Sequence, residues 1–225
     1  MTIPVLLTIC CVIIDQIFLV QMEHRRFGQA TCWKGLASLC FLAVGFFMTF
    51  LATASNPIHT KIFVGLALGL VGDVLLALCY VWPVKHDLYF VIGAAFFAVG
   101  HVFYLMALYA LGAKVLTALP FWLVGIGLTA WWAFAKKVDA GSMFIPGGIY
   151  IGLVLAMGAS ACSLFVRQPG IGSGLFALGG VLFCISDAIL ATHKMGQAKE
   201  PKFNRYVHYT YYAAQLMIAW SILWL

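Results

Sequence analysis

The sequence predicts an all-α, polytopic membrane protein built as a bundle of eight transmembrane helices. Of its 225 residues, 64% are hydrophobic and only 9% are charged, whereas soluble domains are roughly half apolar and about a quarter charged. The mean hydropathy is +1.03. Apolar runs of about twenty residues, the length that crosses the hydrocarbon core of a bilayer, recur along the chain. They lie near residues 3–21, 33–54, 61–81, 88–111, 115–135, 144–166, 174–192 and 207–225.

Charged residues, proline or glycine bound each of the first four runs. The first run begins almost at the N-terminus and ends before Glu23. No basic flank or small-residue cleavage site marks it as a signal peptide, so we expect it to remain as a membrane span. The second run ends before Pro57, the third before Pro83 and the fourth before Gly112, where a helix is expected to stop.

The other four runs are bounded in the same way. The fifth lies between Lys114 and Lys136, and the sixth ends at Arg167. The seventh ends before His193, and the eighth follows Arg205 and reaches the last residue. All connections are short, so neighbouring helices are expected to be antiparallel and the chain has no room for a soluble domain.

The orientation follows from the basic residues. Ten of the 13 Lys and Arg residues lie at the connections after the first, third, fifth and seventh runs, and three lie on the opposite side. The positive-inside rule therefore places both termini on the non-cytoplasmic side of a single transmembrane domain, residues 1–225. The ten are Arg25, Arg26, Lys34, Lys85, Lys136, Lys137, Lys194, Lys199, Lys202 and Arg205; the three are Lys61, Lys114 and Arg167.

Topology also explains the formal net charge of +6, and no nucleic-acid partner is expected. Six of the seven cysteines lie within apolar runs, where we expect small core residues, not a disulfide framework. They are Cys10, Cys11, Cys40, Cys79, Cys162 and Cys184.

Of the aspartates inside apolar runs, Asp73 in the third and Asp187 in the seventh carry the strongest signal. A charged side chain at mid-membrane costs at least ~2.5 kcal/mol to insert, so such residues need a partner, a water-filled cavity or a proton. A protonated and an ionised carboxyl group together can perform general acid/base catalysis. The alternative is that each carboxyl is only hydrogen-bonded to a neighbouring helix. Asp15 in the first run has no motif around it, and both interpretations stay open for it.

The eighth run carries a polar stripe. His208, Tyr211, Tyr212 and Gln215 are spaced to project from one helix face, and Gln215 must find hydrogen-bond partners. For His208 and Tyr211, a place in the interfacial aromatic belt is the alternative. In the fourth run, His101 and Tyr104 share a face.

Glycines recur at four-residue spacing before Asp73, at Gly65 and Gly69, and again at Gly148 and Gly152. Such faces let membrane helices approach closely. The alternative is that they leave room for an acyl chain.

Other catalytic sites have little support in the sequence. A catalytic zinc needs about three ligands, but only His101 is expected to lie deep in the membrane. No nucleophile elbow, dinucleotide fingerprint or phosphate-binding loop occurs. The five other histidines are expected near the membrane edges: His24, His59, His86, His193 and His208.

The chain resembles the YhhN-like lysoplasmalogenase family in motifs that follow one another in order. These are Lys34, Gly72-Asp73, His101-x-x-Tyr104, Pro146-x-x-x-Tyr150, Phe183-x-x-Ser186-Asp187-x-x-Leu190-Ala191 and Tyr211-Tyr212-Ala213-Ala214-Gln215-Leu216. One departure is Gly35, where many members of that family have proline. Together the motifs cover the chain from the second run onward.

The resemblance implies eight membrane helices and hydrolysis of the vinyl-ether bond of lysoplasmalogens, without a cofactor. The products are a fatty aldehyde and glycerophosphoethanolamine or glycerophosphocholine. Such a bond is cleaved by protonating its β-carbon, and water then attacks the α-carbon of the oxocarbenium ion. Asp73 and Asp187 are expected to share the acid and base roles, and Lys34 to meet the phosphate. The other expected substrate-binding residues are His101, Tyr104, Tyr150, Ser186, Tyr211, Tyr212 and Gln215.

Two alternatives stay open: a small proton-coupled transporter and a membrane hydrolase of ordinary acyl lysophospholipids. The expected partners are a lysophospholipid substrate and membrane lipids. The expected location is the bacterial inner membrane or the eukaryotic endoplasmic reticulum. The sequence does not assign the oligomeric state.

Overall fold

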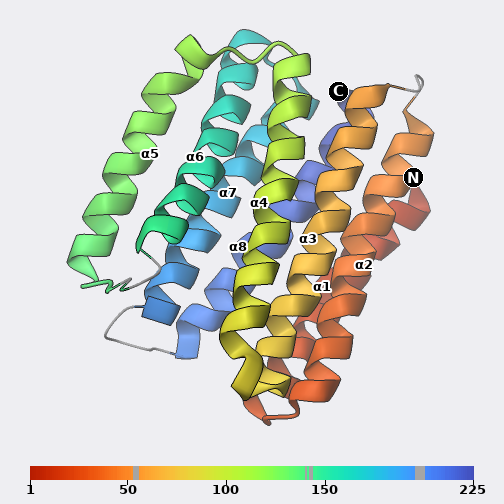
Figure 1. The fold of residues 1–225 in the computed structure, drawn as a ribbon. Helices are drawn as coiled ribbons and strands as arrows, with labels where there is room; N and C mark the ends of the chain where they lie inside the picture. The colour runs from red at the N-terminus through yellow and green to blue at the C-terminus, as the bar shows by residue number, and fades with distance from the viewer. Residues whose placement is uncertain (53–55, 140, 142–143, 196–200) are drawn as a thin grey trace.

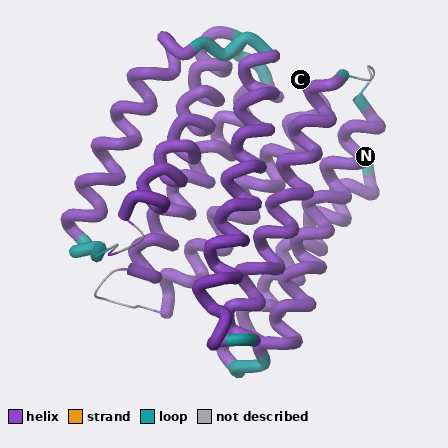
Figure 2. The backbone as a smooth tube through the Cα atoms, viewed as in Figure 1, coloured by secondary structure: helices purple, strands orange, loops and turns teal. Residues whose placement is uncertain are grey.

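A computed structural model of the chain (Figure 1) describes residues 1–52, 56–139, 141, 144–195 and 201–225. This described part is helical apart from short connections (Figure 2), which confirms the all-α prediction. Its eight long helices are α1 (Thr2–Glu23), α2 (Phe27–Leu51), α3 (Pro57–Val81), α4 (His86–Ala110), α5 (Val115–Ala135), α6 (Phe144–Arg167), α7 (Ile171–Met195) and α8 (Pro201–Ser221). Two short 3-10 helices, η1 (Pro83–Lys85) and η3 (Ile222–Trp224), precede α4 and follow α8.

Seven of these helices, α1 to α7, are long and apolar enough to cross a membrane. The chain is therefore a multi-pass membrane protein. The eighth helix carries the polar stripe, and its passage through the membrane stays a prediction. Both chain ends lie at one end of the bundle, opposite the connection from α1 to α2 (Figure 1).

Six helices form a ring in which each packs against the next, in the order α2, α3, α4, α6, α7 and α8, and α8 closes on α2. Outside this ring, α1 packs against α2 and α8, and α5 packs mainly against α6. The outlying position of α5 at the edge of the bundle (Figure 1) agrees with its single buried residue, Ala118. The ring encloses the hydrophobic core and the polar groups described below.

Glycines on α3 let the neighbouring helices approach closely, as predicted from their spacing. A Cβ atom added at Gly65 would lie 2.3 Å from the Tyr104 ring, and one added at Gly69 would lie 2.7 Å from Gln215 Nε2. The same packing interpretation is wrong for Gly148 and Gly152, because nothing lies within 4 Å of an added Cβ at either residue.

The helix ends differ most from the predicted spans at the starts of two helices. Both α2 and α8 begin six residues before their apolar runs. Arg25 adopts a left-handed conformation (φ 56°) that reverses the chain directly after α1, so α2 starts at Phe27. Proline is favoured in the first turn of a helix, where its missing N–H needs no partner, which suits Pro201 as the start of α8.

Two expectations about individual residues are wrong. Cys10 is exposed on α1, not a core residue, because it faces away from the bundle. Lys34, counted above as a loop charge, is buried within α2. Of the other nine charges assigned to the cytoplasmic side, Lys199 lies outside the described residues, and Lys194 and Lys202 are described by their backbone alone.

Candidate active site

A cavity of about 350 Å³ lies within the helix ring, and both Asp73 and Asp187 line it. Its wall consists mainly of aliphatic and aromatic side chains from α3, α4, α6 and α7, together with Phe18 of α1. Small-molecule sites are commonly of this kind, an apolar concavity with a few convergent polar groups. Six other polar or ionisable side chains complete the wall. They are Lys34, Tyr80, Tyr150, Ser186, His208 and Tyr211.

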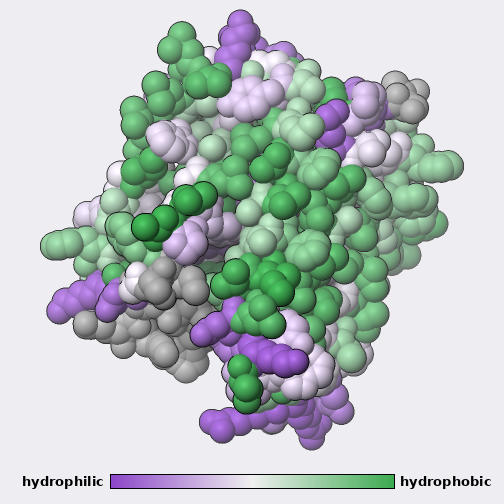
Figure 3. Space-filling model, in the orientation of Figure 1, coloured by the Kyte–Doolittle hydropathy of each residue, from purple (hydrophilic) through white to green (hydrophobic). Residues whose placement is uncertain are grey.

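The cavity opens sideways between the first halves of α4 and α6. Val91 and Ala95 on α4, and Ile149 on α6, line the cavity and are also exposed on the surface of the protein. The space-filling view shows a recess beside α4 with hydrophobic residues around it (Figure 3). The cavity is therefore accessible from the side of the helix bundle.

Asp73 is held by three donors. Its Oδ2 atom accepts hydrogen bonds of 2.6 Å from both Ser38 Oγ and Tyr211 OH. Its Oδ1 atom lies 3.3 Å from the ammonium nitrogen of Lys34. The Lys34 ammonium also lies 5.5 Å from the centre of the Phe18 ring, within the range of a cation–π contact. Because a carboxylate accepts and cannot donate, these contacts fit its ionised form.

A hydrogen-bond chain supports Tyr211 from behind the cavity wall. The hydroxyl of Tyr104 donates to Gln215 Oε1 (3.0 Å), and Gln215 Nε2 donates to the Tyr211 hydroxyl oxygen (3.1 Å). Gln215 thus finds its predicted hydrogen-bond partners in two tyrosines. Gly69 gives this amide its space, since an added Cβ would collide with it.

Asp187 has a different environment. Its Oδ2 atom accepts a 2.8 Å hydrogen bond from Tyr150 OH. Within the described part of the chain, no other hydrogen bond or ion pair reaches this carboxyl group. One oxygen is therefore left to face a molecule in the cavity. The two acids lie in one site but in unequal surroundings.

The remaining candidates divide into two groups. Tyr150, Ser186 and Tyr211 line the cavity, although the Ser186 hydroxyl donates to the Val207 carbonyl oxygen of α8 at 3.1 Å. Four others lie behind the wall and are buried: His101, Tyr104, Tyr212 and Gln215. They can act on a molecule in the cavity only through their neighbours.

His101 is enclosed by aromatic rings. It packs edge-on against Phe183 with the ring centres 4.6 Å apart, and Tyr104 and Tyr150 lie beside it. Neither of its ring nitrogens has a hydrogen-bond partner among the described residues.

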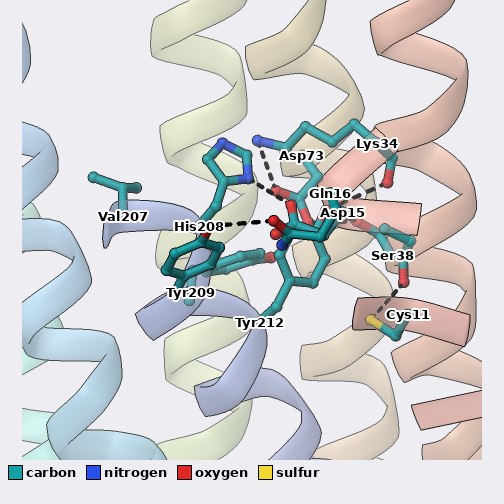
Figure 4. Close-up of polar contacts among 12 residues, drawn as sticks. Cys11, Asp15, Gln16, Lys34, Ser38, Asp73, Val207, His208, Tyr209 and Tyr212 are labelled. Carbon is teal, nitrogen blue, oxygen red and sulfur yellow. Dashed lines mark hydrogen bonds and ion pairs between the residues drawn. The ribbon is translucent and has the colours of Figure 1, made fainter. Parts of the chain in front are cut away.

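Several residues of the site were not among the predicted ones, and three of them lie in its polar network. Ser38 donates to Asp73, and its position four residues after Lys34 on one face of α2 was the available signal. Asp15 and His208 form a pair, with Asp15 Oδ1 and His208 Nδ1 3.0 Å apart (Figure 4). The His208 ring is buried and stacked on Phe18, so it does not belong to a lipid-facing aromatic belt.

Tyr211 likewise is buried, and the interfacial-belt interpretation is wrong for it. The hydroxyl oxygen of Tyr212, the next residue, lies 3.3 Å from Ser38 Oγ and 3.4 Å from the Lys34 carbonyl oxygen. Among the side chains that the structure describes, no three of His, Cys, Asp or Glu are grouped as metal ligands would be.

Comparison with known proteins identifies the family. The YhhN family profile matches residues 29–222. The chain is 32% identical to "Lysoplasmalogenase TMEM86A" from Bos taurus over 181 residues, 79% of this chain and 69% of the relative. It is 33% identical to "Lysoplasmalogenase TMEM86A" from Homo sapiens over 172 residues, 74% of this chain and 67% of the relative. No solved structure matches the chain. The chain belongs to the YhhN family.

Proposed function

We propose that this protein is a lysoplasmalogenase, which hydrolyses the vinyl-ether bond of 1-alkenyl lysophospholipids. The products are a fatty aldehyde and glycerophosphoethanolamine or glycerophosphocholine. The observation that carries the proposal is that two buried carboxyl groups share one apolar cavity open to the lipid. Both relatives bear the name lysoplasmalogenase.

Asp187 is the proton donor in this proposal. Only one of its oxygens is engaged, by Tyr150, and the carboxyl group lines the cavity. It can therefore present a proton to the β-carbon of a vinyl ether lying in the cavity. Protonation there places the positive charge on the α-carbon and the ether oxygen.

Asp73 stabilises that charge. Its three donors fix the carboxylate in place, so the negative charge needs no reorganisation when the oxocarbenium ion forms. Preorganised electrostatic stabilisation of this kind is a large term in many enzymes. The reaction needs water but no cofactor.

The alkenyl chain enters through the opening between α4 and α6. A volume of about 350 Å³ is at the lower end of the range for small-molecule sites. The cavity therefore takes the reacting bond and the carbons beside it, while the rest of the chain extends into the lipid. Tyr150, Ser186, Tyr211 and Lys34 line the part occupied by the substrate, and the residues behind the wall hold them in place.

The test is release of aldehyde from a vinyl-ether lysolipid by the purified protein in detergent. Asp187→Asn and Asp73→Asn should each lower kcat by at least about 10²-fold. Asp87→Asn is the matched control, because the Asp87 side chain is 93% exposed at the start of α4. Full activity in a folded Asp187→Asn variant would contradict the scheme.

The same assay separates the other two functions. An acyl lysophospholipid with the same chain should release little fatty acid, whereas an ordinary lysophospholipase would prefer it. A transporter would show no chemical turnover in detergent at all.

The topology proposed with this function has eight membrane passes in one transmembrane domain, residues 1–225, with both termini on the non-cytoplasmic side. The basic residues at the opposite end support it, as does the common end of the two termini in Figure 1. In the bacterial inner membrane or the endoplasmic reticulum, the cavity would then open toward the cytoplasmic leaflet. Labelling of terminal tags from the cytoplasmic side only would overturn this orientation.

A further inference from the structure

The pair formed by Asp15 and His208 lies at the cavity, and the mechanism above does not use it. Asp15 belongs to α1, outside the residues matched by the family profile, and His208 belongs to α8. Both side chains are buried, and His208 is part of the cavity wall. A buried carboxyl group inside an apolar membrane helix needs a partner or a function.

The His208 ring is held in the way that an oriented general base would be. Asp15 Oδ1 lies 3.0 Å from His208 Nδ1, and the Phe18 ring stacks on the imidazole with the centres 4.6 Å apart. When a carboxylate accepts from Nδ1–H, the neutral ring keeps Nε2 as its acceptor. Figure 4 shows the second ring nitrogen of His208 turned away from Asp15. Within the described residues, no hydrogen bond uses Nε2.

Asp73 is poorly suited to accept a proton from water. Two hydroxyl groups and an ammonium group already occupy its oxygens. A proton taken up there would displace at least one of these donors. The charged groups around His208 are Asp15 on α1, Lys34 on α2 and Asp73 on α3, and of these Lys34 is a donor only.

We propose that His208, oriented by Asp15, is the general base that removes a proton from the attacking water. The inference rests on the proposed vinyl-ether hydrolysis. His208 is then a catalytic residue and Asp15 a positioning residue.

The full cycle balances with these two acid–base groups. Asp187 gives its proton to the β-carbon of the vinyl ether, and the oxocarbenium ion forms. Water bonds to the α-carbon while His208 Nε2 takes one of its protons, which gives a hemiacetal. The bond from the α-carbon to the glycerol oxygen then breaks. His208 returns its proton to that oxygen, and Asp187 takes the hydroxyl proton of the hemiacetal, so aldehyde and alcohol are released and both groups are restored.

Deuterium exchange tests the step assigned to His208. If water attack is slowed, the oxocarbenium ion returns its proton to Asp187, and deuterium from D₂O enters the β-carbon of unreacted substrate. The measurement is the deuterium content of recovered lysoplasmalogen by mass spectrometry, divided by the aldehyde formed. A residue with only a structural role would lower both quantities together.

His208→Gln should lower kcat by about 10²-fold or more and raise the ratio of exchange to turnover above that of the unmodified protein. Asp15→Asn should likewise lower kcat and raise this ratio. It decides the question if His208→Gln does not fold. The matched control is His59→Gln. His59 is also buried, but it lies near the start of α3 and does not line the cavity. Unchanged kcat, or a lower kcat with no rise in the ratio, would overturn the proposal.

Failure of this inference is distinct from failure of the proposed function. If Asp187→Asn abolishes both aldehyde release and exchange, the vinyl-ether chemistry stands whatever His208→Gln does. If the unmodified protein releases no aldehyde, the function itself fails.

Discussion

At the scale of single residues, the ion pair between Lys34 and Asp73 is a costly feature of the site, because both charges are removed from water. Both side chains are buried, with only 10% and 2% of their side-chain surface exposed. Removing one partner of a buried pair leaves an uncompensated charge and costs roughly 3–5 kcal/mol, whereas replacing both is often neutral. The pair therefore trades stability for a fixed charge in the cavity.

We predict that Lys34→Met lowers the free energy of unfolding by roughly 3–5 kcal/mol. The double variant Lys34→Met with Asp73→Asn should recover much of this loss and remain inactive. Thermal denaturation in detergent and aldehyde release measure the two effects. Equal denaturation midpoints for Lys34→Met and the unmodified protein would show that the pair does not hold the site together. If Lys34 instead serves only the phosphate group, the single variant would raise KM and leave stability unchanged.

The sequence identifies some of these residues and not others, for a physical reason. Asp73 and Asp187 stand out because a carboxyl group inside an apolar run is costly in lipid. The pairing of Asp15 with His208 cannot be predicted from spacing, because the two residues are 193 positions apart. Ser38 is inconspicuous because a serine in a membrane helix can satisfy its own hydroxyl against the backbone one turn earlier.

At the scale of helices, the apolar runs predict that a helix is present better than they predict the residues at which it begins and ends. Every apolar run corresponds to a helix. In lipid, a single segment can satisfy its own backbone hydrogen bonds only as a helix. The starts of α2 and α8 lie outside those runs because polar residues can also be helical, so a helix continues beyond its apolar part as long as its backbone allows. The glycine spacing on α3 predicts close packing, but the same spacing at Gly148 and Gly152 does not, because the spacing does not show whether another helix faces it.

We predict that Gly65→Ala destabilises the contact between α3 and α4. The added methyl group would overlap the buried ring of Tyr104 and cost about 1–3 kcal/mol. The displaced Tyr104 would also weaken the hydrogen-bond chain through Gln215, so kcat should fall as well. Gly127→Ala on α5 is the control, because nothing lies within 4 Å of its added Cβ. Equal denaturation midpoints for these two variants would contradict the prediction.

At the scale of the whole molecule, the ring arrangement explains how distant motifs form one site. Each of the six ring helices contributes a polar side chain to the cavity wall or directly behind it. The cavity is enclosed by α3, α7 and α8 but reaches the surface between α4 and α6. In the proposed function, this arrangement places the reacting bond inside the bundle, while the rest of the lipid chain stays in the bilayer.

A large side chain at the opening should therefore obstruct lipid substrates selectively. Ala95 of α4 lines the cavity and is exposed at its mouth, so Ala95→Trp narrows the path without touching either acid. We expect kcat/KM for a long-chain lysoplasmalogen to fall about tenfold or more, which corresponds to about 1.4 kcal/mol. A short, water-soluble vinyl ether should be hydrolysed at a nearly unchanged rate, because it does not need to thread a chain between the helices.

The matched control is Ala130→Trp, which adds the same side chain to the exposed surface of α5. If Ala95→Trp and Ala130→Trp have the same effect on the long-chain substrate, the substrate does not enter between α4 and α6. Loss of activity toward both substrates in Ala95→Trp alone would instead show that α4 has moved and the site is distorted. Selective loss of the long-chain reaction is the result that lateral entry requires, because only a chain that remains in the lipid passes through the opening during the reaction.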